Sequence, residues 1–466
     1  MNIRRNKILL YKIGRYQMDF EYLFPKANIC GYIVDVKDSD QYNGKKLYQI
    51  DEITKSKFKH YKIIICDRKD ESISNKLKRS GFLEKKNYYW LEDIGYLLDD
   101  SIDYFTTKFL RIFIAKVSKY FFDHDTTKNS VYFKEMIYTD SVDNVRCEFP
   151  FKYVQLQKRG YNYCCCDGWT KRDIGNSFFR GNKGVWNSNL AQLHRLSIIN
   201  KTYIFCLPNQ CPFMKAKAKK TSSRFYDLEK RSIPEVVCVA FDSSCNLKCP
   251  SCRKDYFNAQ GFSFRYLKHL SKKFSKSDLA LKSKELIIAS QGEVFFSRIY
   301  KDMIFKSKIT ERDSITIHTN ATLLTRRTLD KLCSIYKEIK FLISVDAIKK
   351  ETYEKIRCGG NFDILMKNLA YLSEARKSGK VQEVSLLYVV QKGNYKEMID
   401  FVKYVKKMGF DFVDFSRIEN WLTFTDEEFK NVSMYDENGQ AKKELKEVLK
   451  NPIFKDKVVL KGNVIE

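Results

Sequence analysis

The sequence contains no apolar run of the roughly 18 residues that a membrane-spanning helix requires. The first segment, Met1–Lys7, is basic, and the apolar run that follows it covers only Ile8–Tyr11. This run is too short for a secretory signal peptide. Proline is also scarce, with 7 residues in 466, whereas 44% of the residues are hydrophobic and 14% are aromatic. This composition predicts a globular, cytoplasmic protein of about two to four domains with no membrane span.

Cysteine, in contrast, is plentiful, with 14 residues. In a cytoplasmic protein this number favours metal or redox chemistry over a disulfide framework. The net charge is 85 − 57 = +28, which makes a nucleic-acid partner one alternative. The dense basic run is Lys215–Arg224, which falls in a predicted linker, and lysine is frequent throughout the chain. A solvated surface is therefore favoured over a nucleic-acid interface.

The most informative stretch holds three cysteines within eight residues: Cys245, Cys249 and Cys252. Three thiolates on one loop can bind three irons of a [4Fe–4S] cluster and leave the fourth iron open to a ligand. A zinc loop would need a fourth Cys or His nearby, but the next histidine is His269 and the next cysteine is Cys333. The spacing favours a cluster, with zinc as the alternative.

This stretch resembles the cluster loop of the radical SAM enzymes, and later segments resemble that family in the same order. These segments are Ala289–Glu293, Ile317–Asn320, Ser344–Asp346, Tyr353–Asn361 and Val389–Asn394. The resemblance covers residues 230–435, approximately. It implies an enzyme that reductively cleaves S-adenosylmethionine (SAM) at a [4Fe–4S] cluster. The resulting 5′-deoxyadenosyl radical would abstract hydrogen from a substrate.

The same resemblance implies which residues bind SAM. Glu293 would receive the methionine ammonium group, and Ser344 with Arg357 would hold the carboxylate. The full predicted set is Gly292, Glu293, Asn320, Ser344, Arg357 and Gln391. An electron donor such as flavodoxin or ferredoxin would reduce the cluster.

A second group of cysteines lies upstream, between residues 147 and 211. Cys147, Cys206, Cys211 and one of the consecutive Cys164–Cys166 could supply four thiolates to a second Fe–S cluster or to zinc. The arrangement resembles the SPASM or twitch module of radical SAM enzymes, which carries auxiliary clusters, although here it precedes the core. Within that resemblance the spacing favours Cys165. The predicted auxiliary ligands are Cys147, Cys165, Cys206 and Cys211.

Apolar runs at regular intervals from Val236 to Phe415 predict strands buried on both faces, with amphipathic helices between them. This pattern predicts an α/β fold, a partial (βα)6 TIM-type barrel with active residues at the C-terminal ends of its strands. Near the N-terminus, Lys7–Tyr11, Ile29–Val34 and His60–Cys66 predict a small parallel Rossmann-like unit. The first turn of this unit contains one glycine, Gly14, where a dinucleotide site needs three, so a docking or degenerate module is favoured over a working nucleotide site.

The predicted domains are a Rossmann-like unit (1–100), a helical connection (101–140), a SPASM/twitch-like Fe–S module (141–222), a radical SAM core (223–436) and a C-terminal tail (437–466). The predicted function is a radical SAM enzyme with an auxiliary Fe–S cluster that acts on a peptide or a sugar-like small molecule. The alternatives are an RNA-modifying radical SAM enzyme and a zinc-stabilised binding protein without radical chemistry.

Overall fold

The structure is a computed structural model of the 466-residue chain. It describes residues 6–13, 17, 20–21, 27–37, 39–66, 70–84, 86–90, 147–157, 161–170, 173–176, 182–188, 191–192, 194–195, 198, 203, 205–207, 211, 233–421, 423–436, 439–462 and 464. The helical connection predicted for 101–140 lies outside the described residues, as do Gly14 and the basic run 215–224.

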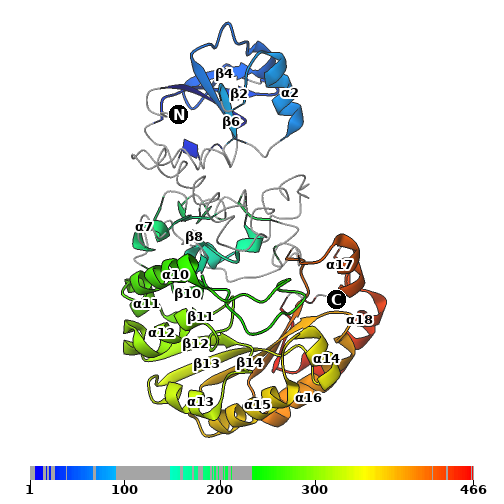
Figure 1. The fold of residues 1–466 in the computed structure, drawn as a ribbon. Helices are drawn as coiled ribbons and strands as arrows, with labels where there is room; N and C mark the ends of the chain where they lie inside the picture. The colour runs from blue at the N-terminus through cyan, green and yellow to red at the C-terminus, as the bar shows by residue number, and fades with distance from the viewer. Residues whose placement is uncertain are drawn as a thin grey trace.

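The N-terminal unit, drawn in blue at the top of Figure 1, is built on a sheet. The order of its strands is β3-β4-β2-β1-β5-β6. Its strands are β1 (Lys7–Tyr11), β2 (Ile29–Val34), β3 (Gln41–Tyr42), β4 (Lys45–Gln49), β5 (Tyr61–Ile65) and β6 (Tyr88–Trp90). The ladders are parallel except for the β3–β4 hairpin. The strand order reverses at β1, which lies between β2 and β5. This topology confirms the Rossmann-like prediction.

The second sheet has ten strands in the order β16-β15-β14-β13-β12-β11-β10-β7-β8-β9. Its strands are β7 (Tyr153–Gln157), β8 (Tyr161–Tyr163), β9 (Gly175–Asn176), β10 (Val236–Ala240), β11 (Glu285–Ile288), β12 (Ser314–Thr319), β13 (Glu338–Ser344), β14 (Glu383–Val390), β15 (Phe412–Arg417) and β16 (Val459–Leu460). The consecutive strands β10 to β15 are all parallel, which confirms the six-stranded core.

Helices line the outside of this curved sheet in Figure 1. The α-helices of the chain are α2 (Glu71–Arg79), α5 (Phe149–Lys152), α7 (Asn182–Trp186), α10 (Gly261–Phe274), α11 (Asp278–Lys282), α12 (Arg298–Lys306), α13 (Arg326–Cys333), α14 (Lys350–Ile356), α15 (Phe362–Lys377), α16 (Met398–Met408), α17 (Asp426–Val432) and α18 (Lys443–Leu449). Short 3-10 helices cover Ile50–Glu52, Asp167–Trp169, Lys308–Glu311, Tyr395–Glu397 and Pro452–Lys455. Side chains cap the starts of two of these helices: Thr325 accepts the N–H of Thr328 in α13, and Asn361 accepts the N–H of Ile364 in α15.

The cysteine-rich module is continuous with the core sheet. Its first strand, β7, pairs in parallel with β10 along Tyr153–Gln157, and β8 and β9 extend the sheet in antiparallel fashion. This pairing explains how a module that precedes the core in sequence can lie directly against its first strand. In Figure 1, α7 and β8 lie between the N-terminal unit and the core.

The last residues also belong to the core sheet, in a region where the sequence suggested a tail. Strand β16 pairs in parallel with β15, and helix α18 buries Leu445 and Leu449 completely or nearly so. Phe454 and Val464 join the same hydrophobic core.

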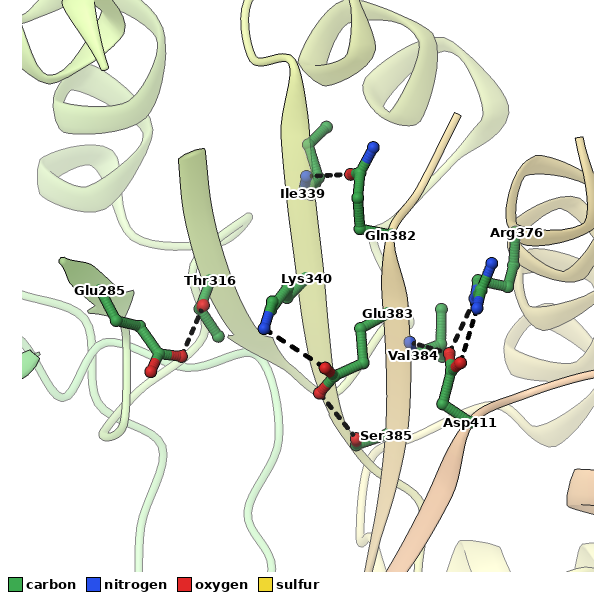
Figure 2. A network of polar contacts seen from close by, with 10 residues as sticks. All are labelled: Glu285, Thr316, Ile339, Lys340, Arg376, Gln382, Glu383, Val384, Ser385 and Asp411. Carbon is green, nitrogen blue, oxygen red and sulfur yellow. Dashed lines mark hydrogen bonds and ion pairs between the residues drawn. The ribbon is translucent and has the colours of Figure 1, made fainter. Parts of the chain in front are cut away.

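A network of polar contacts connects neighbouring core strands near the ends at which they begin (Figure 2). Thr316 donates to Glu285 over 2.9 Å, linking the neighbouring strands β12 and β11. Arg376 donates two hydrogen bonds, of 2.8 and 2.6 Å, to the carboxylate of Asp411. Asp411 also accepts the N–H of Val384 at the start of β14. In barrels of this kind the opposite rim, at the strands' C-terminal ends, carries the chemistry.

Candidate active site

The loop after β10 carries the three cysteines of the predicted cluster site. Cys245 and Cys249 are buried, whereas Cys252 is exposed. Each sulfur lies near a side-chain donor: Asn320 Nδ2 is 3.9 Å from Cys245, Arg357 Nη1 is 3.8 Å from Cys249, and Arg253 Nη2 is 3.5 Å from Cys252. Donors and positive charges stabilise thiolates, which are the form that binds iron.

At the two buried cysteines, burial and the neighbouring positive charges act on the thiol pKa in opposite directions. It raises the pKa of Cys245 to about 11, although the charge of Arg253 acts in the other direction. Burial likewise raises the pKa of Cys249 against the charge of Arg357. Iron binding at this loop would therefore release protons.

Gly292 packs against the backbone of the cysteine loop. Its φ is +79°, and a Cβ atom here would lie 2.5 Å from the carbonyl oxygen of Asp242 and 2.8 Å from that of Ser244. A side chain at this position would be strained by its backbone angle and would also push the loop outward. The glycine thus allows the end of β11 to approach the loop.

The Glu293 carboxylate is completely buried and joins the ends of β11 and β12. It accepts hydrogen bonds from Thr319 Oγ1 at 2.6 Å, Asn320 N at 2.7 Å and Phe295 N at 3.2 Å. Burial raises its pKa, and these three bonds act against that rise. A carboxylate has about four acceptor positions, so one is left for a further donor.

The predicted carboxylate-binding pair, Ser344 and Arg357, has protein partners. Ser344 Oγ lies 3.0 Å from His318 Nε2, and burial together with the charge of Arg357 lowers the pKa of His318 to about 4. The imidazole is therefore neutral at pH 7. Arg357 forms a 2.7 Å ion pair with Asp346, a residue to which the sequence assigned no role. The sequence signal that could have identified Asp346 is its position, since it is an acidic residue just past the C-terminal end of β13.

Buried polar atoms without a partner mark the same end of the barrel. Among the described residues they include Arg357 Nε, Gln391 Nε2 and the Tyr353 hydroxyl. Buried donors normally find acceptors, so these atoms fit a ligand that brings oxygen or nitrogen acceptors of its own. SAM has a carboxylate, ribose hydroxyls and an adenine ring, and the donor set suits it.

The second cysteine group surrounds a cavity in the module. The cysteines that line it are Cys147, Cys164, Cys165, Cys206 and Cys211. His194 joins them, with its Nδ1 atom 3.2 Å from the Cys164 sulfur. The hydrogen bond between the two neighbouring thiols lowers the pKa of Cys164 and raises that of Cys165. Four of the five are the predicted auxiliary ligands, and Cys164 is the addition.

No three His, Cys, Asp or Glu side chains in the described parts of the chain are gathered closely enough to hold a metal ion. Both cysteine sets therefore remain proposals as ligands. No helix among the described residues is long and apolar enough to cross a membrane.

Residues 241–405 match the family model of the radical SAM superfamily. This segment of the chain is a radical SAM domain. The radical SAM family implies a [4Fe–4S] cluster and SAM as cofactors, and the matched segment contains the cysteine loop and all six predicted SAM-binding residues. No curated protein matches the sequence of the enzyme closely enough to count as a relative.

Solved structures that match part of the chain include SuiB from Streptococcus suis bound to precursor peptide SuiA, with 16% identity, 49% of each chain covered and a TM-score of 0.35. Native anSMEcpe with AdoMet and the Cp18Cys peptide shows 20% identity, coverage of 44% of this chain and 55% of that one, and a TM-score of 0.32. TYW1 with a lysine-pyruvate adduct shows 16% identity, coverage of 44% and 70%, and a TM-score of 0.29. The chain spans about half the length of SuiB.

Proposed function

We propose that Cys245, Cys249 and Cys252 hold the [4Fe–4S] cluster and that SAM binds at the adjoining strand ends. The cluster, when bound, supplies the electron that cleaves SAM and gives the radical that abstracts hydrogen from the substrate. The observation that carries this proposal is that each of the three sulfurs has a side-chain donor nearby. Three buried polar atoms without a hydrogen-bond partner, on Tyr353, Arg357 and Gln391, support it.

The protein's own residues would position SAM and exclude water from it. The guanidinium of Arg357 and the hydroxyl of Ser344 would hold the carboxylate, and the remaining acceptor position of Glu293 would receive the ammonium group. Asn320 would hold the loop, because its amide also donates to Asn246 Oδ1 over 3.1 Å. The partnerless amide nitrogen of Gln391 would bind an acceptor on SAM.

The cavity in the cysteine module would hold an auxiliary Fe–S cluster. Cys147, Cys206 and Cys211 supply three thiolates, and Cys165 is the fourth ligand that we propose. Such a cluster would take an electron from the substrate radical or bind the substrate directly. Zinc at the same thiolates is the alternative.

The substrate that we propose is a peptide or a sugar-like small molecule, and the reductant is a flavodoxin or ferredoxin in the cytoplasm. An RNA substrate is the second candidate because the net charge is +28. If RNA were the substrate, its affinity would fall steeply as salt rises, because bound counterions are released from the phosphates. RNA affinity that does not depend on salt would remove this candidate.

The deciding experiment is an anaerobic count of iron and sulfide, with EPR of the reduced protein recorded with and without SAM. We expect about eight irons per chain and a spectrum that SAM alters. In a Cys249→Ala variant we expect about four irons and no response to SAM. About four irons in the wild-type protein would leave the module with zinc or empty. A protein that takes up no iron would refute the proposal.

A further inference from the structure

Asp346 lies just past the end of β13 and contacts Arg357, one of the predicted SAM-binding residues, but belongs to neither predicted ligand set itself. It follows β13, is 2% exposed and has a left-handed backbone with φ of 67°. Its Oδ1 atom accepts the N–H of Val389 in β14 over 2.7 Å, and its Oδ2 atom lies 2.7 Å from Arg357 Nη2. Its carbonyl oxygen accepts the Asn394 amide over 2.8 Å. The carboxylate is therefore fixed on one side by the sheet.

Arg357, the partner of Asp346, begins the loop after α14, and its side chain is 14% exposed. Its three nitrogens have different surroundings. Nη2 binds Asp346, Nη1 lies 3.8 Å from the Cys249 sulfur, and Nε is buried without a hydrogen-bond partner. A guanidinium is planar, so fixing one nitrogen against a rigid acceptor also fixes where the other two lie.

We propose that Asp346 is a positioning residue for Arg357. It holds the guanidinium against Cys249, the second cysteine of the cluster loop, and leaves Nε free for the SAM carboxylate. This inference rests on the proposed function, because it gives Arg357 a task at the cluster and at SAM. It adds an acid whose effect on SAM binding passes entirely through the arginine.

Asp411 provides a matched control, because it contacts the start of β14 whereas Asp346 contacts a residue near the end of that strand. Like Asp346, it binds an arginine, Arg376, and accepts a backbone N–H from β14, in this case from Val384 (Figure 2). It lies at the rim where the core strands begin, away from the cysteine loop. Asp411→Asn therefore removes an arginine-bound carboxylate, 20% exposed against 3% for Asp346, without disturbing Arg357.

The test uses the full-length, anaerobically reconstituted protein and measures SAM affinity by calorimetry. We expect Asp346→Asn to weaken SAM binding about tenfold, because a charge-assisted contact loses its alignment. Asp411→Asn should bind SAM like the wild-type protein. Arg357→Lys should weaken binding at least as much, and the double variant of Asp346 and Arg357 should be no weaker than Arg357→Lys alone. Additive losses in the double variant would overturn the proposal.

The midpoint potential of the cluster without SAM gives a second readout that a purely structural role would not explain. Removing the Asp346 charge alone would raise the potential, because a nearby negative charge disfavours the reduced cluster. If Arg357 also leaves Cys249, the loss of its positive charge offsets that rise. We therefore expect little or no rise in Asp346→Asn. A raised potential together with unchanged SAM affinity would overturn the inference.

Asp346→Asn breaks a buried ion pair, which destabilises proteins strongly. If this variant does not fold, Asp346→Glu decides the question, since it keeps the charge but displaces the carboxylate by one methylene. Weaker SAM binding by a folded Asp346→Glu protein would support the proposal, and wild-type affinity would overturn it. A wild-type protein without iron would instead refute the proposed function itself.

Discussion

The rings of His194 and Phe205 stack face to face, with centroids 4.2 Å apart and planes 5° apart. His194 contacts Cys164 at the cavity, whereas Phe205 packs in a hydrophobic cluster of the N-terminal unit that includes Ile8 and Leu10. This pair connects the Rossmann-like sheet to the cysteine cavity. A module that lacks the glycines of a nucleotide site can thus still support the rest of the protein by packing.

We therefore predict that Phe205→Ala lowers the iron content of the auxiliary site. Removing this buried ring should also cost about 3–5 kcal/mol of stability. Phe58→Ala is the control, because Phe58 is buried in the other hydrophobic cluster of the N-terminal unit. Thermal unfolding and iron analysis would be compared for the two variants. Equal iron contents would show that the stack does not support the cavity.

The cavity predicts which of the three consecutive cysteines matter. Cys164 and Cys165 line it, but Cys166 does not. We expect Cys206→Ala and Cys165→Ala to lose the auxiliary cluster, about four irons per chain, while Cys166→Ala keeps it. Iron analysis beside EPR would report this, and the SAM-dependent signal should persist in all three variants. A loss of iron in Cys166→Ala would contradict this assignment.

Gly292→Ala should disturb the cluster loop. Its new Cβ would meet the Asp242 and Ser244 carbonyls, and overpacking of this kind costs about 1–3 kcal/mol. Gly379→Ala isolates the backbone effect, since its φ of +77° is nearly the same but nothing lies within 4 Å of the added Cβ. We expect lower thermal stability and less iron in Gly292→Ala than in Gly379→Ala. Indistinguishable variants would mean that the loop moves without cost.

His318 should contribute to acid sensitivity. Its folded-state pKa is about 4, lowered by burial and the charge of Arg357, whereas an unfolded histidine titrates near 6.5. The stability from its neutral ring is thus complete above about pH 6.5 and is lost as the pH falls toward about 4. Between pH 7.5 and 5.5, the wild-type protein should lose about 1 kcal/mol that His318→Gln does not lose.

Urea unfolding at these two pH values would measure the difference. His60→Gln, at an exposed position, is the control and should keep the pH dependence of the wild-type protein. If His318→Gln showed the same pH dependence as the wild-type protein, the ring would not be buried in its neutral form.

The sequence by itself determined the features that depend on nearby residues. The spacing of Cys245, Cys249 and Cys252 defined the loop, because its chemistry requires three thiolates on a short segment. Apolar runs defined strands β10 to β15, since parallel strands buried on both faces leave continuous hydrophobic stretches. These strands also placed Glu293, Asn320 and Ser344 at or just past C-terminal strand ends, as expected for a barrel site.

Only the tertiary structure decided the contacts between distant segments. No local pattern could show that β7 pairs with β10, that Cys164 lines the cavity with Cys165, or that Asp346 binds Arg357. Such pairings depend on how the whole chain packs, because residues far apart in sequence meet only once the sheets and their covering helices have formed. The local sequence thus shows which groups are reactive, whereas the fold of the whole chain determines how these groups are aligned.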